Sequence, residues 1–215
     1  MRKYAKYIPI ISLAALMAAI AAGLLIFWPY STTVVLVVRH ADTTVPGPAC
    51  TEEEGCPIPV VNPAAGNRSI STTAGEARRD ELWHVVEDTG IQAIYASCFC
   101  RAQQTVATVD NNLAAVTTIK KSQHKANAGA TDLEPDVADL VDRINTTHVG
   151  QKVLVAGHQS TVKQLILDLG GGTIDDIGGT EFDNLYVVTI TRGWWRWWGW
   201  GKRVRLVRLK YGVPT

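Results

Sequence analysis

The sequence predicts an α/β fold: a three-layer sandwich around a mostly parallel central sheet, with a C-terminal antiparallel hairpin and one N-terminal transmembrane helix before the sheet. Short apolar strands alternate with amphipathic stretches, which is typical of a parallel sheet covered by helices. The chain has 215 residues, of which 47% are hydrophobic. This length suits one sizeable domain, and is too short for two ordinary domains plus an anchor.

Three apolar runs without polar alternation predict strands that are buried on both faces of the sheet. These runs are Val34–Val38, Ile91–Ala96 and Val153–Ala156. Two later runs, Leu185–Thr191 and Val204–Leu209, lie on either side of a tryptophan-rich segment. They predict the antiparallel hairpin.

Four amphipathic stretches predict helices. In the first, Thr73 and Glu76 have the spacing of a capping box, and Gly90 ends the helix. The other three helices are expected at about Ala102–Asp110, Pro135–Asn145 and Ser160–Leu169. The resulting order of strand and helix indicates a mostly parallel sheet.

The N-terminal helix is predicted from residues 8–28, which carry no charge. Twenty-one residues at about 1.5 Å each span a hydrocarbon core of about 30 Å. The run ends in bulky residues instead of a small-residue cleavage site, which favours an anchor over a cleaved signal peptide. Three positive charges before it place the N-terminus in the cytoplasm. We therefore expect a membrane anchor or uncleaved signal in residues 1–30 and an extracytoplasmic domain, periplasmic or extracellular, in residues 31–215.

Charge is distributed unevenly along the chain. The net charge is +1, yet residues 30–191 hold 11 basic and 20 acidic side chains, whereas residues 184–215 hold seven basic and no acidic ones. An acidic main body disfavours nucleic-acid binding, which needs a basic surface.

Arginine and histidine side chains follow the three buried strands. Arg39 and His40 come directly after the first strand, Arg101 begins the helix after the second, and His158 follows the third. Ligands of open α/β sheets bind at the carboxyl ends of the strands, where these side chains converge. Guanidinium groups bind phosphoryl groups bidentately, and an imidazole can act as a nucleophile. The pattern predicts a site that processes an anion.

Four segments resemble, in order and in spacing, the motifs of the histidine phosphatase superfamily, the phosphoglycerate mutase-like enzymes. They are VVLVVRHADT, STTAGEAR, IYASCFCRAQQTVAT and VLVAGHQST. The resemblance implies a phosphatase domain that hydrolyses small phosphomonoesters through a phosphohistidine intermediate. It makes His40 the nucleophile and Arg39 and Arg101 the phosphoryl-binding residues, with His158 completing the pocket. Such a site needs neither a metal nor a cofactor.

The general acid departs from the family pattern. The glutamate motif of the sugar-phosphate mutases is absent between Arg101 and His158. Asp42, Glu181 and Glu134 are candidate proton donors, and without a donor the activity would favour phosphate esters or phosphoramidates with good leaving groups. Two alternatives stay open: a non-catalytic phospho-ligand binding module of the same fold, and a phosphomutase.

The four cysteines lie in two loops, Cys50 and Cys56 in one and Cys98 and Cys100 in the other. In an oxidising compartment we expect at least one disulfide between the loops, because two cysteines one residue apart close a ring poorly. A local bridge from Cys50 to Cys56 is the alternative.

The remaining histidines, His84, His124 and His148, are expected on the surface. Neither the cysteine nor the histidine spacing matches a zinc motif. Five of the seven tryptophans lie between residues 194 and 200. They predict either contact with a membrane interface or packing on the sheet.

Overall fold

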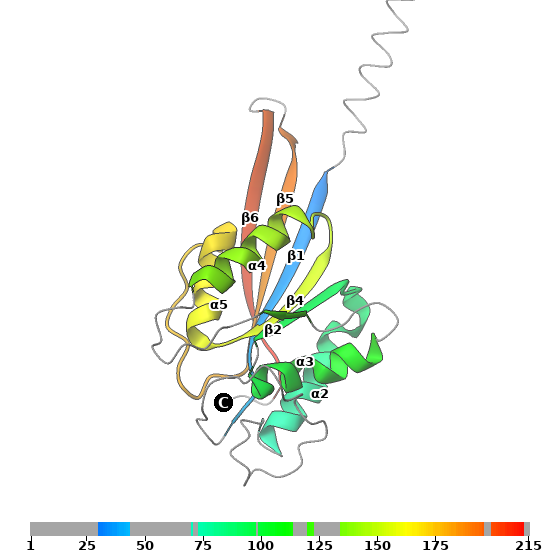
Figure 1. The fold of residues 1–215 in the computed structure, drawn as a ribbon, viewed down its shortest axis with the longest axis vertical. Helices are drawn as coiled ribbons and strands as arrows, with labels where there is room; N and C mark the ends of the chain where they lie inside the picture. The colour runs from blue at the N-terminus through cyan, green and yellow to red at the C-terminus, as the bar shows by residue number, and fades with distance from the viewer. Residues whose placement is uncertain are drawn as a thin grey trace, which may run out of the picture. The chain divides into compact units, whose positions relative to one another are not determined.

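The computed structural model describes residues 30–43, 70, 73–97, 99–113, 120–122, 134–195 and 199–212 (Figure 1). The predicted membrane segment, residues 8–28, lies outside this part and stays a prediction. Within the described ranges, no helix is both long and apolar enough to cross a bilayer.

Strands and helices alternate along the described chain (Figure 1). In order they are β1 (Ser31–Arg39), α2 (Ala74–Val86), the 3-10 turn Glu87–Thr89, β2 (Ala93–Ser97), α3 (Cys100–Asn112), β3 (Lys120–Ser122), α4 (Glu134–Thr146), β4 (Lys152–Gly157), α5 (Gln159–Ile166), the π turn Leu167–Gly171, β5 (Asn184–Trp195) and β6 (Gly199–Lys210). Thr32–Thr191 and Arg203–Thr215 belong to one compact unit, and Met1–Ser31 with Arg192–Lys202 to another.

The strands form one mixed sheet in the order β3-β2-β4-β1-β5-β6. β1 pairs in parallel with β4, from Val34 opposite Lys152 to Arg39 opposite Gly157, and β2 pairs in parallel with β3 and β4. The end of β6 lies beside the start of β5, because the Tyr211 N–H donates to the Asp183 carbonyl at 2.9 Å. These two strands therefore run antiparallel, and the predicted α/β class with a C-terminal hairpin is confirmed.

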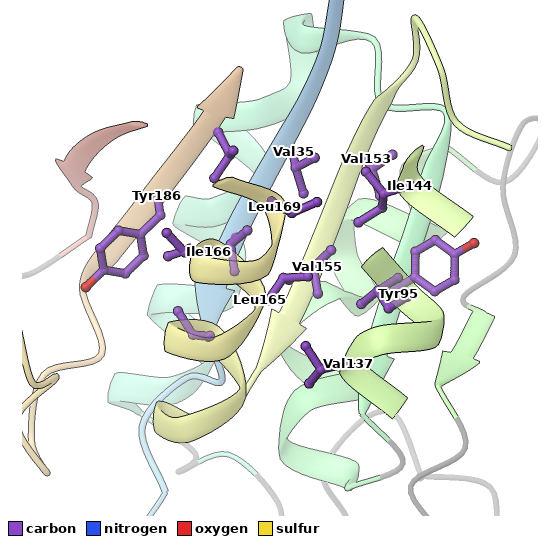
Figure 2. Close-up of a cluster of buried hydrophobic side chains, with 14 of the residues drawn as sticks. Val35, Tyr95, Val137, Ile144, Val153, Val155, Leu165, Ile166, Leu169 and Tyr186 are labelled. Atoms are coloured by element: carbon purple, nitrogen blue, oxygen red, sulfur yellow. The ribbon is translucent and has the colours of Figure 1, made fainter. Parts of the chain in front are cut away.

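Two separate cores make the fold three-layered. Alternate residues of β1 point to opposite faces: Val35 and Val37 pack with α4 and α5, whereas Leu36 and Val38 pack with α2 and α3. Figure 2 shows the first core, in which Val153 and Val155 of the sheet lie among side chains of α4 and α5, such as Ile144 and Leu165. Burying each such side chain contributes roughly 1.5–3 kcal/mol to the free energy of folding. Packing on both faces therefore fixes the position of the sheet and of the residues that follow its strands.

The structure differs from the predicted elements in three places. β3 was not predicted, because its sequence Lys-Lys-Ser has no apolar signal. The predicted capping box is wrong, since the Thr73 side chain makes no capping hydrogen bond to α2. The helix predicted to end at Leu169 instead leaves α-helical geometry at Leu167 and continues as a π turn, in which Gly170 has a φ of +93°.

Candidate active site

The predicted strand-end residues come together at one edge of the sheet. The His40 N–H donates to the Gly157 carbonyl at 2.9 Å, which extends the pairing of β1 and β4 by one residue. The rings of His40 and His158 consequently lie 5.2 Å apart between centroids. Arg101, in the first turn of α3, places Nη2 3.4 Å from His158 Nδ1. Arg39 ends β1 directly before His40.

His40 is buried and held in one tautomer. Its side chain Nδ1 lies 2.8 Å from the Ala41 carbonyl oxygen, which can only accept, so Nδ1 carries the proton. The other ring nitrogen, Nε2, then carries the lone pair. Burial lowers the pKa of His40 to about 4, and the positive charges of Arg101 and Arg39 act in the same direction. Nε2 is therefore unprotonated at neutral pH, as a nucleophile requires.

His158 lies between a donor and a hydroxyl. Arg101 is only a donor, so His158 Nδ1 accepts from it, and the proton sits on Nε2, which is 2.7 Å from Ser97 Oγ. The His158 N–H donates to Thr161 Oγ1 at 2.7 Å, which fixes the residue at the start of α5. The Phe99 ring meets the His158 ring edge-on at 4.7 Å. His158 is thus fixed at the start of α5, with its ring beside that of His40.

The Arg39 guanidinium uses two of its three nitrogen atoms for hydrogen bonds to backbone carbonyls. Nη1 donates to the carbonyls of Gly178 at 2.6 Å and Glu181 at 3.1 Å, and Nη2 donates to that of Gly179 at 2.9 Å. The guanidinium also stacks on Phe182, 4.2 Å from the ring centroid. Nε is buried and has no hydrogen-bond partner among the residues described. A buried N–H of this kind requires an explanation, and an anion at the site supplies one.

Thr105 joins the nucleophile segment to α3. Its hydroxyl is buried, accepts from the Ala41 N–H at 2.8 Å and donates to the Arg101 carbonyl at 2.6 Å. Ala41 is also the residue whose carbonyl orients His40. One hydroxyl therefore sets the position of His40 relative to Arg101.

Two of the candidate proton donors, Asp42 and Glu181, accept hydrogen bonds within the protein. Asp42 accepts from Arg78 Nε at 2.6 Å, and Arg78 is buried. The Gly178 N–H donates to the Glu181 carboxylate and lowers its pKa, an effect reinforced by Lys210 and Arg208. The lowered pKa of Glu181 favours its ionised form, which suits a proton donor poorly. Nothing is described of the Glu134 side chain.

Sequence reasoning missed Ser97, Thr105 and Phe182 as site residues. The quoted motifs contain the first two, but a hydroxyl within a buried strand or helix has no local signal that separates it from a core residue. Phe182 comes from the segment before β5, and only the fold places it beside Arg39 and His40.

His148 is not on the surface as expected. It is buried, with Nε2 2.7 Å from Tyr95 Oη and Nδ1 2.6 Å from Gln151 Oε1. The surface prediction for His148 is wrong, because its partner Tyr95 lies in a strand far away in the sequence. His84 is exposed as predicted, and His124 lies outside the described residues.

Cys100 is disulfide-bonded, in agreement with the expectation of at least one disulfide. Cys50, Cys56 and Cys98 lie outside the described residues, so the predicted connection between the two loops stays a prediction. In the ranges that the structure covers, no three His, Cys, Asp or Glu side chains are placed to hold a metal ion.

Known proteins resemble this chain in fold and not in sequence. No family model matches the sequence, and no curated protein matches it. Two solved structures, mycobacterial hydrolase 2 and mycobacterial hydrolase 1, match with TM-scores of 0.51 and 0.50 and identities of 11% and 12%. The matches cover 86% of this chain and 94% and 100% of theirs.

The chain shares the fold of known hydrolases. Structures of the histidine phosphatase superfamily are also among its matches. One is the protein histidine phosphatase SixA complexed with tungstate, at a TM-score of 0.47 and 18% identity, covering 82% of this chain and 96% of that one. At these identities the likeness concerns the hydrolase fold, and the chemistry rests on the side chains described above.

Proposed function

We propose that this chain is a phosphatase that transfers the phosphoryl group of a small phosphomonoester to His40 and then to water. One observation carries the proposal: His40 is a buried neutral imidazole with its Nε2 lone pair available, and Arg39, which precedes it in the chain, has a buried Nε without a hydrogen-bond partner among the described residues. A nucleophile and an anion-binding donor are the two groups that phosphoryl transfer needs most.

The proposed reaction has two displacement steps. In the first, the Nε2 lone pair of His40 forms an N–P bond, the P–O bond breaks, and its electron pair leaves with the leaving-group oxygen. In the second, water attacks phosphorus, the N–P bond breaks with its pair returning to Nε2, and the water proton passes to solvent. Arg39 and Arg101 balance the charge of the equatorial phosphoryl oxygens in both steps.

The proposed substrates have leaving groups that depart without a proton from the protein. The support is that Asp42 and Glu181, the two candidate donors whose side chains are described, are each engaged by cationic or N–H donors. Aryl phosphates, acyl phosphates and phosphoramidates meet this requirement better than alkyl phosphates, whose alkoxide must be protonated as it leaves.

Hydrolysis of 4-nitrophenyl phosphate by the full chain in detergent tests the proposal. We expect release of inorganic phosphate, which a binding module would not produce, and a loss of at least about 10³-fold in kcat/KM for His40→Ala. His84→Ala is the matched control, because it removes an exposed imidazole and leaves the site intact. Undiminished turnover by His40→Ala would refute the role of His40.

A series of aryl phosphates tests the substrate class separately. We expect kcat to fall steeply as the pKa of the leaving phenol rises, since no protein group donates a proton to it. A flat dependence would contradict the leaving-group proposal while leaving the phosphatase proposal in place.

The proposed enzyme is tethered to a membrane by residues 8–28, with its catalytic domain, residues 31–215, on the extracytoplasmic side. The uncharged run and the three preceding positive charges support this arrangement. The disulfide at Cys100 agrees with an oxidising compartment. Protease added to intact cells that express the full chain should digest the domain. Digestion that occurs only after lysis would contradict the orientation.

A further inference from the structure

The segment directly before β5 folds back onto Arg39. Backbone carbonyls of this segment accept hydrogen bonds from the Arg39 guanidinium, and the Phe182 ring lies against it, 4.2 Å from Cζ to the ring centroid. We call residues 178–182 the Arg39 loop. Arg39 itself is buried, and a buried charge requires polar partners. The loop supplies them.

The Arg39 loop uses one part of the guanidinium and leaves another part available. A guanidinium has five N–H groups, two on each Nη and one on Nε. Both N–H groups of Nη1 donate to the loop, to the carbonyls of Gly178 at 2.6 Å and Glu181 at 3.1 Å, and one N–H of Nη2 donates to that of Gly179 at 2.9 Å. Among the described residues, nothing accepts from the buried Nε. The N–H of Nε and the second N–H of Nη2 therefore remain for a ligand, and such a pair matches two oxygens of a phosphoryl group.

Glu181 closes the Arg39 loop with both its backbone and its side chain. The Glu181 N–H donates to the Gly178 carbonyl at 3.0 Å, which forms a tight turn, and the Gly178 N–H donates back to Glu181 Oε2 at 2.8 Å. Of the three loop carbonyls, that of Gly178 is also the nearest to the guanidinium. The Glu181 side chain therefore fixes the orientation of the peptide groups that hold Arg39.

Strand β6 holds the other oxygen of the same carboxylate. Glu181 Oε1 accepts from Arg208 Nη2 at 3.0 Å and from Lys210 Nζ at 3.4 Å. Arg208 is held in turn, because its Nε donates at 2.8 Å to Oδ1 of Asn184, a buried residue. These contacts connect the Arg39 loop to the sheet, so the loop carbonyls keep a fixed place beside the end of β1.

We infer that Glu181 is a positioning residue for the proposed phosphoryl transfer. It closes the Arg39 loop, and the loop carbonyls orient the guanidinium so that its Nε edge faces the transferred phosphoryl group. Both oxygens of the Glu181 carboxylate accept hydrogen bonds from protein donors, which suits this role better than proton donation. The inference rests on the proposed function, because it assigns Arg39 to the phosphoryl group.

Three Glu181 variants of the full chain in detergent test the inference, with 4-nitrophenyl phosphate as the substrate. Glu181→Ala removes the acceptor of the Gly178 N–H, so we expect kcat/KM to fall about thirtyfold. Glu181→Met should cause the same loss, although it keeps the length of the side chain. Glu181→Gln should stay within about threefold of the unmodified chain, because its amide oxygen can still accept from Gly178.

Asp139→Ala is the matched control. It removes an exposed carboxylate that pairs with Arg143 within α4, and it should leave kcat/KM unchanged. The Glu181 side chain is 31% exposed, so we expect its variants to fold, and their unfolding midpoints verify this. A loss in Glu181→Gln as large as that in Glu181→Ala and Glu181→Met would overturn the inference.

A series of aryl phosphates separates positioning from proton donation. Misplacement of Arg39 slows transfer from every substrate, so the loss in Glu181→Ala should be the same whatever the pKa of the leaving phenol. A proton donor would instead make the loss grow as the pKa of the phenol rises. A loss that grows in this way would overturn the inference and return Glu181 to the role of general acid.

Binding of inorganic phosphate tests the connection to Arg39 without turnover. Isothermal titration calorimetry gives the Kd of the unmodified chain, Glu181→Ala, Arg39→Ala and the double variant. We expect Glu181→Ala to weaken phosphate binding about tenfold in the unmodified background and to have no effect in the Arg39→Ala background. Equal weakening in both backgrounds would overturn the inference. If the unmodified chain hydrolyses no phosphate ester and the binding data still show this coupling, the proposed function fails and the role of Glu181 in orienting Arg39 stands.

Discussion

Two buried polar clusters lie at opposite ends of β4, and they differ in whether their hydrogen bonds are complete. Before β4, both ring nitrogens of His148 have partners, Tyr95 Oη and Gln151 Oε1. After β4, His40 uses one ring nitrogen on Ala41, and the buried Nε of Arg39 has no partner within the described residues. A histidine whose two ring nitrogens are both hydrogen-bonded within the protein, such as His148, stabilises the fold. Buried groups with hydrogen-bonding capacity left over mark the site.

Removing Arg39 should have the largest effect on activity after the removal of His40 itself. Arg39→Ala deletes the buried Nε and the charge that faces the phosphoryl group, so we expect a loss of about 10²–10³-fold in kcat/KM, or about 3–4 kcal/mol of transition-state stabilisation. Steady-state kinetics with an aryl phosphate measure it. Activity within threefold of the unmodified chain would remove Arg39 from the site.

The pKa of His40 should make stability depend on pH. Its pKa is about 4 in the folded chain and close to 6.5 when unfolded, so the unfolded chain binds more protons between these values. Stability from this residue is complete above pH 6.5 and declines as the pH falls to 4, by about 3 kcal/mol.

Denaturant unfolding of the unmodified chain and of His40→Gln, at pH 7 and pH 4.5, measures this contribution. The difference between the two proteins isolates His40 from carboxylates that titrate in the same range. We expect the variant to lose less stability on acidification. Parallel loss in both proteins would mean that His40 is not buried as a neutral imidazole.

Disrupting the His148 cluster, whose hydrogen bonds are complete, should lower stability without changing the rate of catalysis. His148→Phe strands the Tyr95 hydroxyl and the Gln151 amide without their partner, which should lower the free energy of unfolding by about 2 kcal/mol. Turnover per folded molecule should stay the same. If His148→Phe has normal stability and poor turnover, the His148 cluster is part of the active site and the contrast between the two clusters is wrong.

Thr105 should show the smallest effect, as a positioning residue that touches no substrate. Thr105→Val keeps the shape and removes the hydroxyl that links Ala41 to Arg101, so we expect kcat to fall about tenfold with little change in KM. Thr105→Ser should restore kcat, because it keeps the hydroxyl. Equal losses in both variants would indicate a packing defect instead.

Much of the fold and the choice of site residues could be predicted because their signals are local. Runs such as Val34–Val38 must be buried on both faces, and residues that follow such strands must meet at one edge of the sheet. His40, His158 and Arg101 come together for this reason.

The features that escaped prediction depend on contacts between distant segments. The Arg39 guanidinium binds carbonyls about 140 residues away, and His148 is buried by Tyr95, 53 residues away. β3 is polar and is a strand only because β2 pairs with it. No local pattern of residues encodes such pairings.

The central claim is that His40 accepts the phosphoryl group. The most direct test is to mix the full chain with a fast-leaving aryl phosphate, quench in base within milliseconds, and locate the phosphate by peptide mass spectrometry. We predict an acid-labile, base-stable phosphate on His40 that is absent from His40→Ala. Phosphate on another residue, or undiminished labelling of His40→Ala, would contradict the account.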